Sequence, residues 1–138
     1  MRKLVTVMLT CCALVAYGHS GSDIPERADL ETLAAEFVWD FEAEIVVEKI
    51  TDDLYVLFGV GGNIAVSVGE DGVFIVDDQF PQVMPRIKEA ISDLGGSNID
   101  FAVTTHWHFD HAEGNISLGP EGTWLVAHEN SRDMMKVD

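Results

Sequence analysis

The chain has 138 residues, with 24 acidic side chains against 8 basic ones and a formal net charge of −16 at pH 7. This excess of negative charge disfavours binding to nucleic acid through its phosphates, so we expect no nucleic-acid partner. The only two cysteines, Cys11 and Cys12, lie in an apolar segment near the N-terminus. A metal site later in the chain must therefore use histidine and carboxylate ligands.

The first eighteen residues have the pattern of an export signal. Residues 1–3 are Met-Arg-Lys, and residues 4–17 form an apolar stretch that is broken only by two threonines. Such a stretch is short for a transmembrane helix and typical of a signal peptide. We predict a signal peptide over residues 1–18, a periplasmic or secreted protein, and no membrane span after cleavage. An uncleaved anchor is the alternative.

The next segments change from polar to strand-like. We interpret residues 19–41 as a linker and an N-terminal arm, in which apolar side chains at helical spacing predict a short helix over 29–41. Residues 42–50 contain Ile45-Val46-Val47 and predict an edge strand. Three runs of β-branched and aromatic residues then predict strands; they are 54–58, 63–68 and 73–76.

Glycine-containing connections and a βαβ pattern follow. Gly69-Glu70-Asp71-Gly72 predicts a hairpin turn, and residues 59–62 predict a tight strand connection rather than a phosphate loop, because no Lys-Ser/Thr pair follows. Residues 81–94 have helical spacing, and residues 99–105 predict a strand parallel to the one before the helix. A further strand at 123–127 and a helix from 129 to 135 complete the expected elements.

Four potential metal ligands directly follow the predicted strand 99–105; they are His106, His108, Asp110 and His111. Imidazole and carboxylate are ligands that zinc and similar divalent metals prefer. If the chain stays extended, the first three share one face, while Trp107 and Phe109 point to the other face. A lone histidine is more often a packing or surface residue, but three histidines and an aspartate in register predict a metal site. We call these four residues the histidine–aspartate cluster.

The sequence His-Trp-His-Phe-Asp-His resembles the signature of the metallo-β-lactamase-fold hydrolases. Segments 54–57, 61–65 and 73–77 resemble the opening strands of this superfamily, and the resemblance covers about residues 45–136. It implies an α/β fold, the αββα sandwich with one or two metals between its sheets. Residues 42–138 would hold only its N-terminal half, a mixed β-sheet with flanking helices. We therefore expect a truncated domain that is the first part of a longer protein.

The resemblance also implies roles for individual residues. His106 and His108 would hold a first zinc ion, and Asp110 and His111 a second, with iron as the alternative metal. Asp110 would also be catalytic, by orienting a metal-bound hydroxide. Asp77 matches the family's aspartate behind the metal site, where a carboxylate orients the ligand loops; a simple strand-end turn is the other interpretation.

His128 ends the predicted strand 123–127, and we interpret it as a packing residue rather than as a third ligand. The family's remaining histidine ligands come from later segments.

The expected function is zinc-dependent hydrolysis of a small-molecule ester, lactone, thioester or β-lactam. Histidine at position 111 fits glyoxalase II-like, lactonase-like and subclass B3-like groups and does not choose among them. One alternative is an iron-dependent oxidoreductase of the same fold, similar to persulfide dioxygenases. Another is a non-catalytic exported fragment that binds a metal or a partner. The sequence leaves the oligomeric state open.

Overall fold

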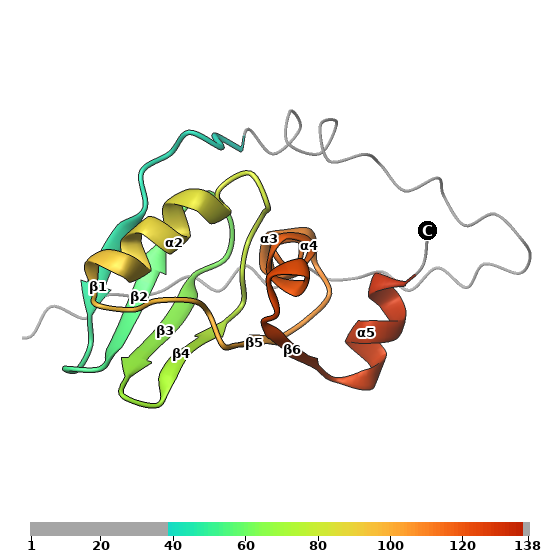
Figure 1. Ribbon diagram of the computed structural model, residues 1–138. Helices are drawn as coiled ribbons and strands as arrows, with labels where there is room; N and C mark the ends of the chain where they lie inside the picture. Colours follow the sequence, from blue (N-terminus) through green and yellow to red (C-terminus); the bar gives the residue numbers. More distant parts are fainter. Residues whose placement is uncertain (1–38, 137–138) are drawn as a thin grey trace, which may run out of the picture.

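The computed structural model describes residues 39–136, which contain one six-stranded sheet. Its strands lie side by side in the order in which they occur along the chain (Figure 1). They are β1 Val46–Lys49, β2 Leu54–Phe58, β3 Ile64–Gly69, β4 Gly72–Val76, β5 Phe101–Thr104 and β6 Trp124–Ala127. Strands β1 to β4 are antiparallel, whereas β5 is parallel to β4 and β6 is parallel to β5. The predicted strands, including the edge strand β1, are confirmed. The predicted signal peptide lies outside the described residues, as do all but residues 39–41 of the predicted linker and N-terminal arm.

The hairpin between β3 and β4 forms as predicted. Gly69 is paired with Gly72, so Glu70 and Asp71 are the two residues of the loop. Gly72 has a φ of +120°, and a side chain at this position would collide with the carboxylate of Asp100. That carboxylate accepts a hydrogen bond from the backbone N–H of Val73 at 2.8 Å and so ties the hairpin to the start of β5.

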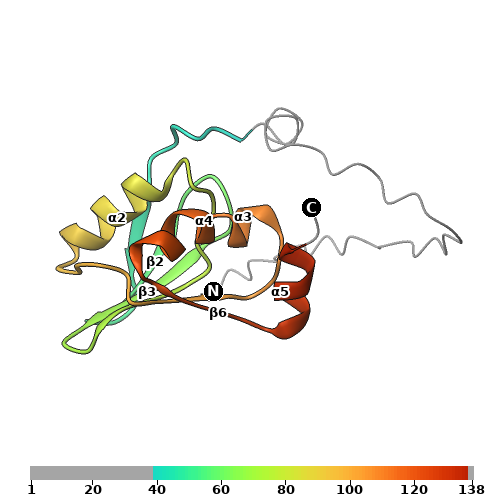
Figure 2. The same cartoon turned by 45° about the vertical axis from the view of Figure 1, so that its right-hand side comes forward.

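Helices cover one face of the sheet. The helices α2 Met84–Asp93, α3 Phe109–Ala112 and α4 Asn115–Leu118 lie on the same side (Figures 1 and 2). The inward side of α2 buries Met84, Ile87 and Ile91, which fit the 3.6-residue period. They pack on alternate residues of the central strands. This core also contains Leu57, Ile64, Val66, Val73, Ile75, Phe80, Val83, Ile99, Ala102 and Leu118.

Two predicted helices differ from those in the structure. The helix predicted over 81–94 begins only at Met84, because the chain first turns at Phe80, whose carbonyl accepts from the N–H of Val83 at 3.2 Å. Pro85 then occupies the first turn, where its missing N–H costs nothing. The helix predicted over 29–41 lies mostly outside the described residues, and residues 39–41 are not helical. Instead, the ring of Trp39 packs on that of Phe80, with 4.7 Å between the ring centres.

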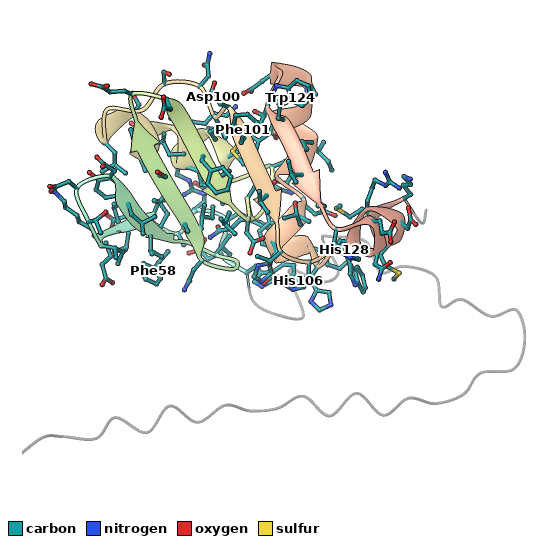
Figure 3. All side chains as sticks on the ribbon, turned by 90° about the horizontal axis from the view of Figure 1, so that it is seen from below. Phe58, Asp100, Phe101, His106, Trp124 and His128 are labelled. Carbon is teal, nitrogen blue, oxygen red and sulfur yellow. The ribbon has the colours of Figure 1, made fainter. Side chains whose placement is uncertain are left out.

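The opposite face of the sheet is apolar and has no helix over it within residues 39–136. Phe74, Phe101 and Trp124 are neighbours across β4, β5 and β6, and their exposed fractions are 41%, 46% and 71%. Val126, two residues beyond Trp124, is also exposed and points to the same side. Figure 3 shows this face from below, with Phe101 and Trp124 next to each other. We call these four residues the open face.

Two helices flank β6. The short 3₁₀ helix η1 Gly119–Glu121 precedes the strand, and the predicted helix α5 Glu129–Met135 follows it. Within residues 39–136 no helix has both the length and the hydropathy that crossing a bilayer requires.

Candidate metal centre

The candidate site lies where the carboxyl ends of the parallel strands β4 and β5 meet. Val76 is paired with Val103, so Asp77 and Thr105 emerge at the same edge of the sheet. The backbone N–H of Asp77 donates to Val103 O at 2.8 Å. Its buried carboxylate accepts from the backbone N–H of Thr105 at 2.7 Å and from the Thr105 hydroxyl at 2.9 Å. Asp77 therefore fixes the point from which the histidine–aspartate cluster departs.

The structure brings all four cluster residues together, but by a route that differs from the prediction. The prediction of an extended backbone through Asp110 is wrong. His108 is extended, with φ −64° and ψ 148°, but α3 begins directly after it at Phe109. Phe109 turns inward and packs against the core, which directs the chain into the helix. The Nε2 atom of His106 lies 3.2 Å from Nδ1 of His108, and the ring centres of His106 and His111 lie 4.1 Å apart.

His111 is held between two carboxylates. Its Nδ1 atom lies 2.7 Å from Oδ2 of Asp77, and its Nε2 atom lies 3.3 Å from Oδ2 of Asp110. A carboxylate can only accept, so the contact with Asp77 places a proton on Nδ1. In the neutral ring the Nε2 lone pair then faces Asp110. Two potential ligand atoms, one nitrogen and one oxygen, therefore lie side by side.

The donor types of the cluster fit a divalent transition metal, although the side chains do not converge on one point. Within residues 39–136 no set of three histidine, cysteine, aspartate or glutamate side chains is arranged to hold an ion as it stands. The close approaches between potential ligand atoms are pairwise, from His106 to His108 and from Asp110 to His111. His108 is exposed and His106 is partly exposed, so both rings can turn without moving the backbone. The cluster therefore suits a divalent metal by the chemistry of its donor atoms.

The electrostatics of His106 favour a neutral ring. Desolvation, followed by repulsion from His111 and His108, lowers the pKa of His106 below its ordinary value. Metals bind the neutral imidazole, so a shift in this direction weakens the competition from protons.

The glycine loop, residues 59–62 between β2 and β3, reaches the cluster from the other side. The backbone N–H of Gly62 donates to the carbonyl of Asp110 at 2.9 Å. A Cβ atom on Gly62 would lie 2.6 Å from both ring nitrogens of His111, and one on Gly61 would lie 2.9 Å from the Asp110 carbonyl oxygen. The loop is a strand connection, as predicted, and the consecutive glycines are the sequence signal for its close approach to the site.

Two residues behind the site were not singled out in the sequence. Asp78 and Gln79 are both 0% exposed, and neither carboxylate oxygen of Asp78 has a hydrogen-bond partner among the described residues. Burial, together with repulsion from Asp77 and Glu113, raises the pKa of Asp78 to about 8. Asp77 and Gln79 have φ values of 64° and 54°, which non-glycine residues rarely adopt. This segment is therefore strained and polar, and it lies directly against the histidine–aspartate cluster.

His128 has a local structural role. Its Nδ1 atom accepts a hydrogen bond from the backbone N–H of Asn130 at 3.2 Å, so it caps the start of α5 at the end of β6. His106 and His128 both lie near the carboxyl ends of their strands (Figure 3). His128 lies at the end of β6 as predicted, but its exposed side chain caps α5 instead of packing in the interior.

Comparisons with known proteins point to one fold. A scan against protein-family models finds no match, and a search of curated proteins finds none. Solved structures do match. The subclass B3 metallo-β-lactamase BJP-1 of Bradyrhizobium japonicum is 28% identical with a TM-score of 0.60, over 68% of this chain and 37% of that one. The metallo-β-lactamase FIM-1 from Pseudomonas aeruginosa, in its mono-zinc form, is 21% identical with a TM-score of 0.61, over 70% and 47%.

A third match is a B3 metallo-β-lactamase with an active-site glutamic acid, which is 25% identical with a TM-score of 0.62. It covers 78% of this chain and 40% of that one, so the chain spans less than half the length of each of these structures. The described residues form a mixed sheet with helices on one face, and the protein therefore has an α/β fold. Its fold is part of the metallo-β-lactamase fold, as the resemblance predicted.

Proposed function

We propose that the protein is a zinc-dependent hydrolase and that the histidine–aspartate cluster supplies part of its ligand set. Its substrate would be a small molecule with an ester, lactone, thioester or β-lactam bond. The matched part spans less than half the length of the structures compared. The activity is therefore proposed for the whole protein in which residues 39–136 occur, rather than for these residues alone.

The contact between His111 and both carboxylates carries this proposal. Asp77 holds the proton on Nδ1, which leaves the other ring nitrogen beside the Asp110 carboxylate. A histidine that binds a metal through one ring nitrogen usually donates its other ring N–H to a carboxylate, which orients the ring. Two acidic groups around one imidazole also supply the negative charge that a dication requires.

The residues of the chain have distinct roles in the proposed reaction. When bound, zinc supplies a Lewis acid that polarises a carbonyl group and acidifies water. His106 and His108 would hold one ion, and Asp110 and His111 would hold a second. Asp110, with an oxygen beside the His111 ring, would orient the attacking water by accepting a hydrogen bond from it. Asp77 keeps the His111 ring in place throughout and does not contact the substrate.

Zinc titration of the whole protein in which residues 39–136 occur tests the ligand assignment. We expect calorimetry to show zinc binding that His108→Ala weakens strongly. The matched control is His128→Ala, which removes a histidine outside the cluster and should leave the affinity unchanged. Absence of zinc binding, or equal affinity in His108→Ala, would refute the assignment.

Hydrolysis is measured on the whole protein with a chromogenic ester, a lactone, a thioester and a β-lactam. Turnover that a chelator abolishes and zinc restores would support the proposal. Iron-dependent oxygen uptake without hydrolysis would overturn it in favour of an oxidoreductase.

We further propose that the protein is exported to the periplasm or beyond, on the basis of the basic and apolar pattern of residues 1–18. N-terminal sequencing of the protein recovered from the cell envelope tests this proposal. A mature chain that starts at His19 is expected, and an intact Met1 in the cytoplasmic fraction would contradict export.

A further inference from the structure

Gln79 holds a backbone conformation that L-residues usually avoid. Its φ is 54°, in the left-handed region, and its side chain is fully buried. Glycine would adopt this conformation without strain, whereas a glutamine persists there only if its surroundings hold it. The contacts of the Gln79 side chain show which part of the structure this strained residue supports.

The amide of Gln79 lies beneath the glycine loop. Its Nε2 atom donates to the carbonyl oxygen of Gly62 at 2.6 Å. A Cβ atom on Gly59 would lie 2.7 Å from Oε1 of Gln79 and 3.1 Å from its Nε2, so the amide also packs directly on Gly59. One buried side chain therefore supports both ends of the glycine loop.

The other side of the loop contacts the metal centre. Gly62 donates to the Asp110 carbonyl at 2.9 Å, and its α-carbon faces the ring of His111 with no side chain between them. The backbone of Gln79 is bonded to the same helical segment, since its carbonyl accepts from Gly114 N–H at 3.0 Å. Gln79 thus links the loop in front of His111 to the segment that carries His111.

We propose that Gln79 is a positioning residue of the metal centre. Its amide holds Gly62 against Asp110 and against the His111 ring, and so fixes the orientation in which the Nε2 atom of that ring faces Asp110. This inference rests on the proposed function, because that function supplies the metal. The packing of Gln79 on the glycine loop can nevertheless be measured without a metal.

Amide exchange of the metal-free 138-residue protein, followed by ¹⁵N NMR, provides the test. Gln79→Asn suits a positive φ, but its amide is one methylene too short to reach Gly62. We expect exchange at the Gly62 N–H to rise about fivefold to tenfold, as loss of one hydrogen bond implies. The imidazole signals of His111 should shift, while exchange at Ile87 in α2 stays constant. Gln82→Asn makes the same change at an exposed position and should alter neither signal.

Gln79→Gly separates the side-chain contact from the strain of the backbone. Glycine relieves the strained φ, so if Gln79 acted only through its backbone conformation, protection at Gly62 and the His111 signals would stay unchanged. Positioning predicts that Gln79→Gly loosens Gly62 and shifts His111 as Gln79→Asn does. Wild-type exchange at Gly62 in both variants would overturn the inference.

Zinc affinity distinguishes this inference from the proposed function. We expect about a tenfold loss in Gln79→Asn, in the range found for residues that support ligands. A wild-type protein that binds no zinc would refute the proposed function, and the exchange experiment would still decide the role of Gln79. Zinc binding that is equal in wild type and Gln79→Asn, with unchanged His111 signals, would overturn the positioning role alone.

Discussion

Replacing Asp77 by asparagine is expected to weaken zinc binding at the histidine–aspartate cluster by about tenfold to a hundredfold. Asparagine keeps the shape of the side chain and tolerates the φ of 64°, so the backbone should stay in place. Aspartate offers two acceptor oxygens, one to Thr105 N–H and one shared by the Thr105 hydroxyl and His111. Asparagine offers one, so either the loop or the His111 ring loses its partner.

The expected size of this effect follows from the contacts. A hydrogen bond to a charged group contributes roughly 1.5–3 kcal/mol. Losing one such bond corresponds to roughly one to two powers of ten in affinity, since each tenfold change is about 1.4 kcal/mol. Competition with a chromogenic chelator measures the zinc affinity, and thermal unfolding shows whether the fold has survived.

Asp100→Asn is the matched control. Asp100 also accepts a backbone N–H, from Val73 at 2.8 Å, but it lies at the opposite end of β5 from His106 (Figure 3). This variant should bind zinc as the wild type does. If Asp77→Asn also kept wild-type affinity while both variants folded, the carboxylate would not orient His111, and our reasoning about the site would be refuted.

Three further changes probe the surroundings of the site. Gly62→Ala places a methyl group against the His111 ring and should lower zinc affinity at least tenfold, whereas Gly69→Ala, with open space around its Cβ position, should not. Asp78→Asn should flatten the pH dependence of the free energy of unfolding. The folded chain retains the proton of Asp78 up to a pKa of about 8, so stability falls as pH rises from about 4 to 8. His128→Ala removes the cap of α5 and should cost about 1 kcal/mol in the free energy of unfolding.

Each of these outcomes can fail in a specific way. Equal zinc affinities for the two glycine variants would mean that the His111 ring moves away from the added methyl group at no cost. An unchanged pH slope in denaturant titrations of Asp78→Asn would mean that this carboxyl is ionised in the folded protein. Undiminished stability of His128→Ala would show that the cap contributes nothing to α5.

The strands could be predicted from the sequence because their signals are local. Runs of β-branched residues between glycines locate β2, β3 and β4, and the Gly69–Gly72 turn fixes the register of their hairpin. The grouping of the cluster was also local, since its four residues lie within six positions of one another. A local pattern therefore sufficed to indicate which residues gather, although not how the backbone carries them.

The remaining features depend on contacts between distant segments. The start of α3 at Phe109 follows from the packing of that ring in the core, which an alternation rule does not include. Asp78 and Gln79 are polar, so their sequence alone predicts exposure to solvent. They are buried because the glycine loop and residues 111–114 enclose the segment 77–80. Sequence reasoning most often fails at strained and functional positions of this kind.

The order of the strands has a consequence for how this sheet folds. Each strand is bonded to the strand that precedes it in the sequence, from β1 to β6. The antiparallel hairpins close over short loops, whereas the parallel strands β5 and β6 each have to wait for intervening helices before they can add to the sheet. Short sequence separations between partners favour fast folding because little chain entropy is lost before each contact forms. The sheet can therefore grow strand by strand, and the hairpins of β1 to β4 can form before β5 brings Thr105 and His111 to Asp77.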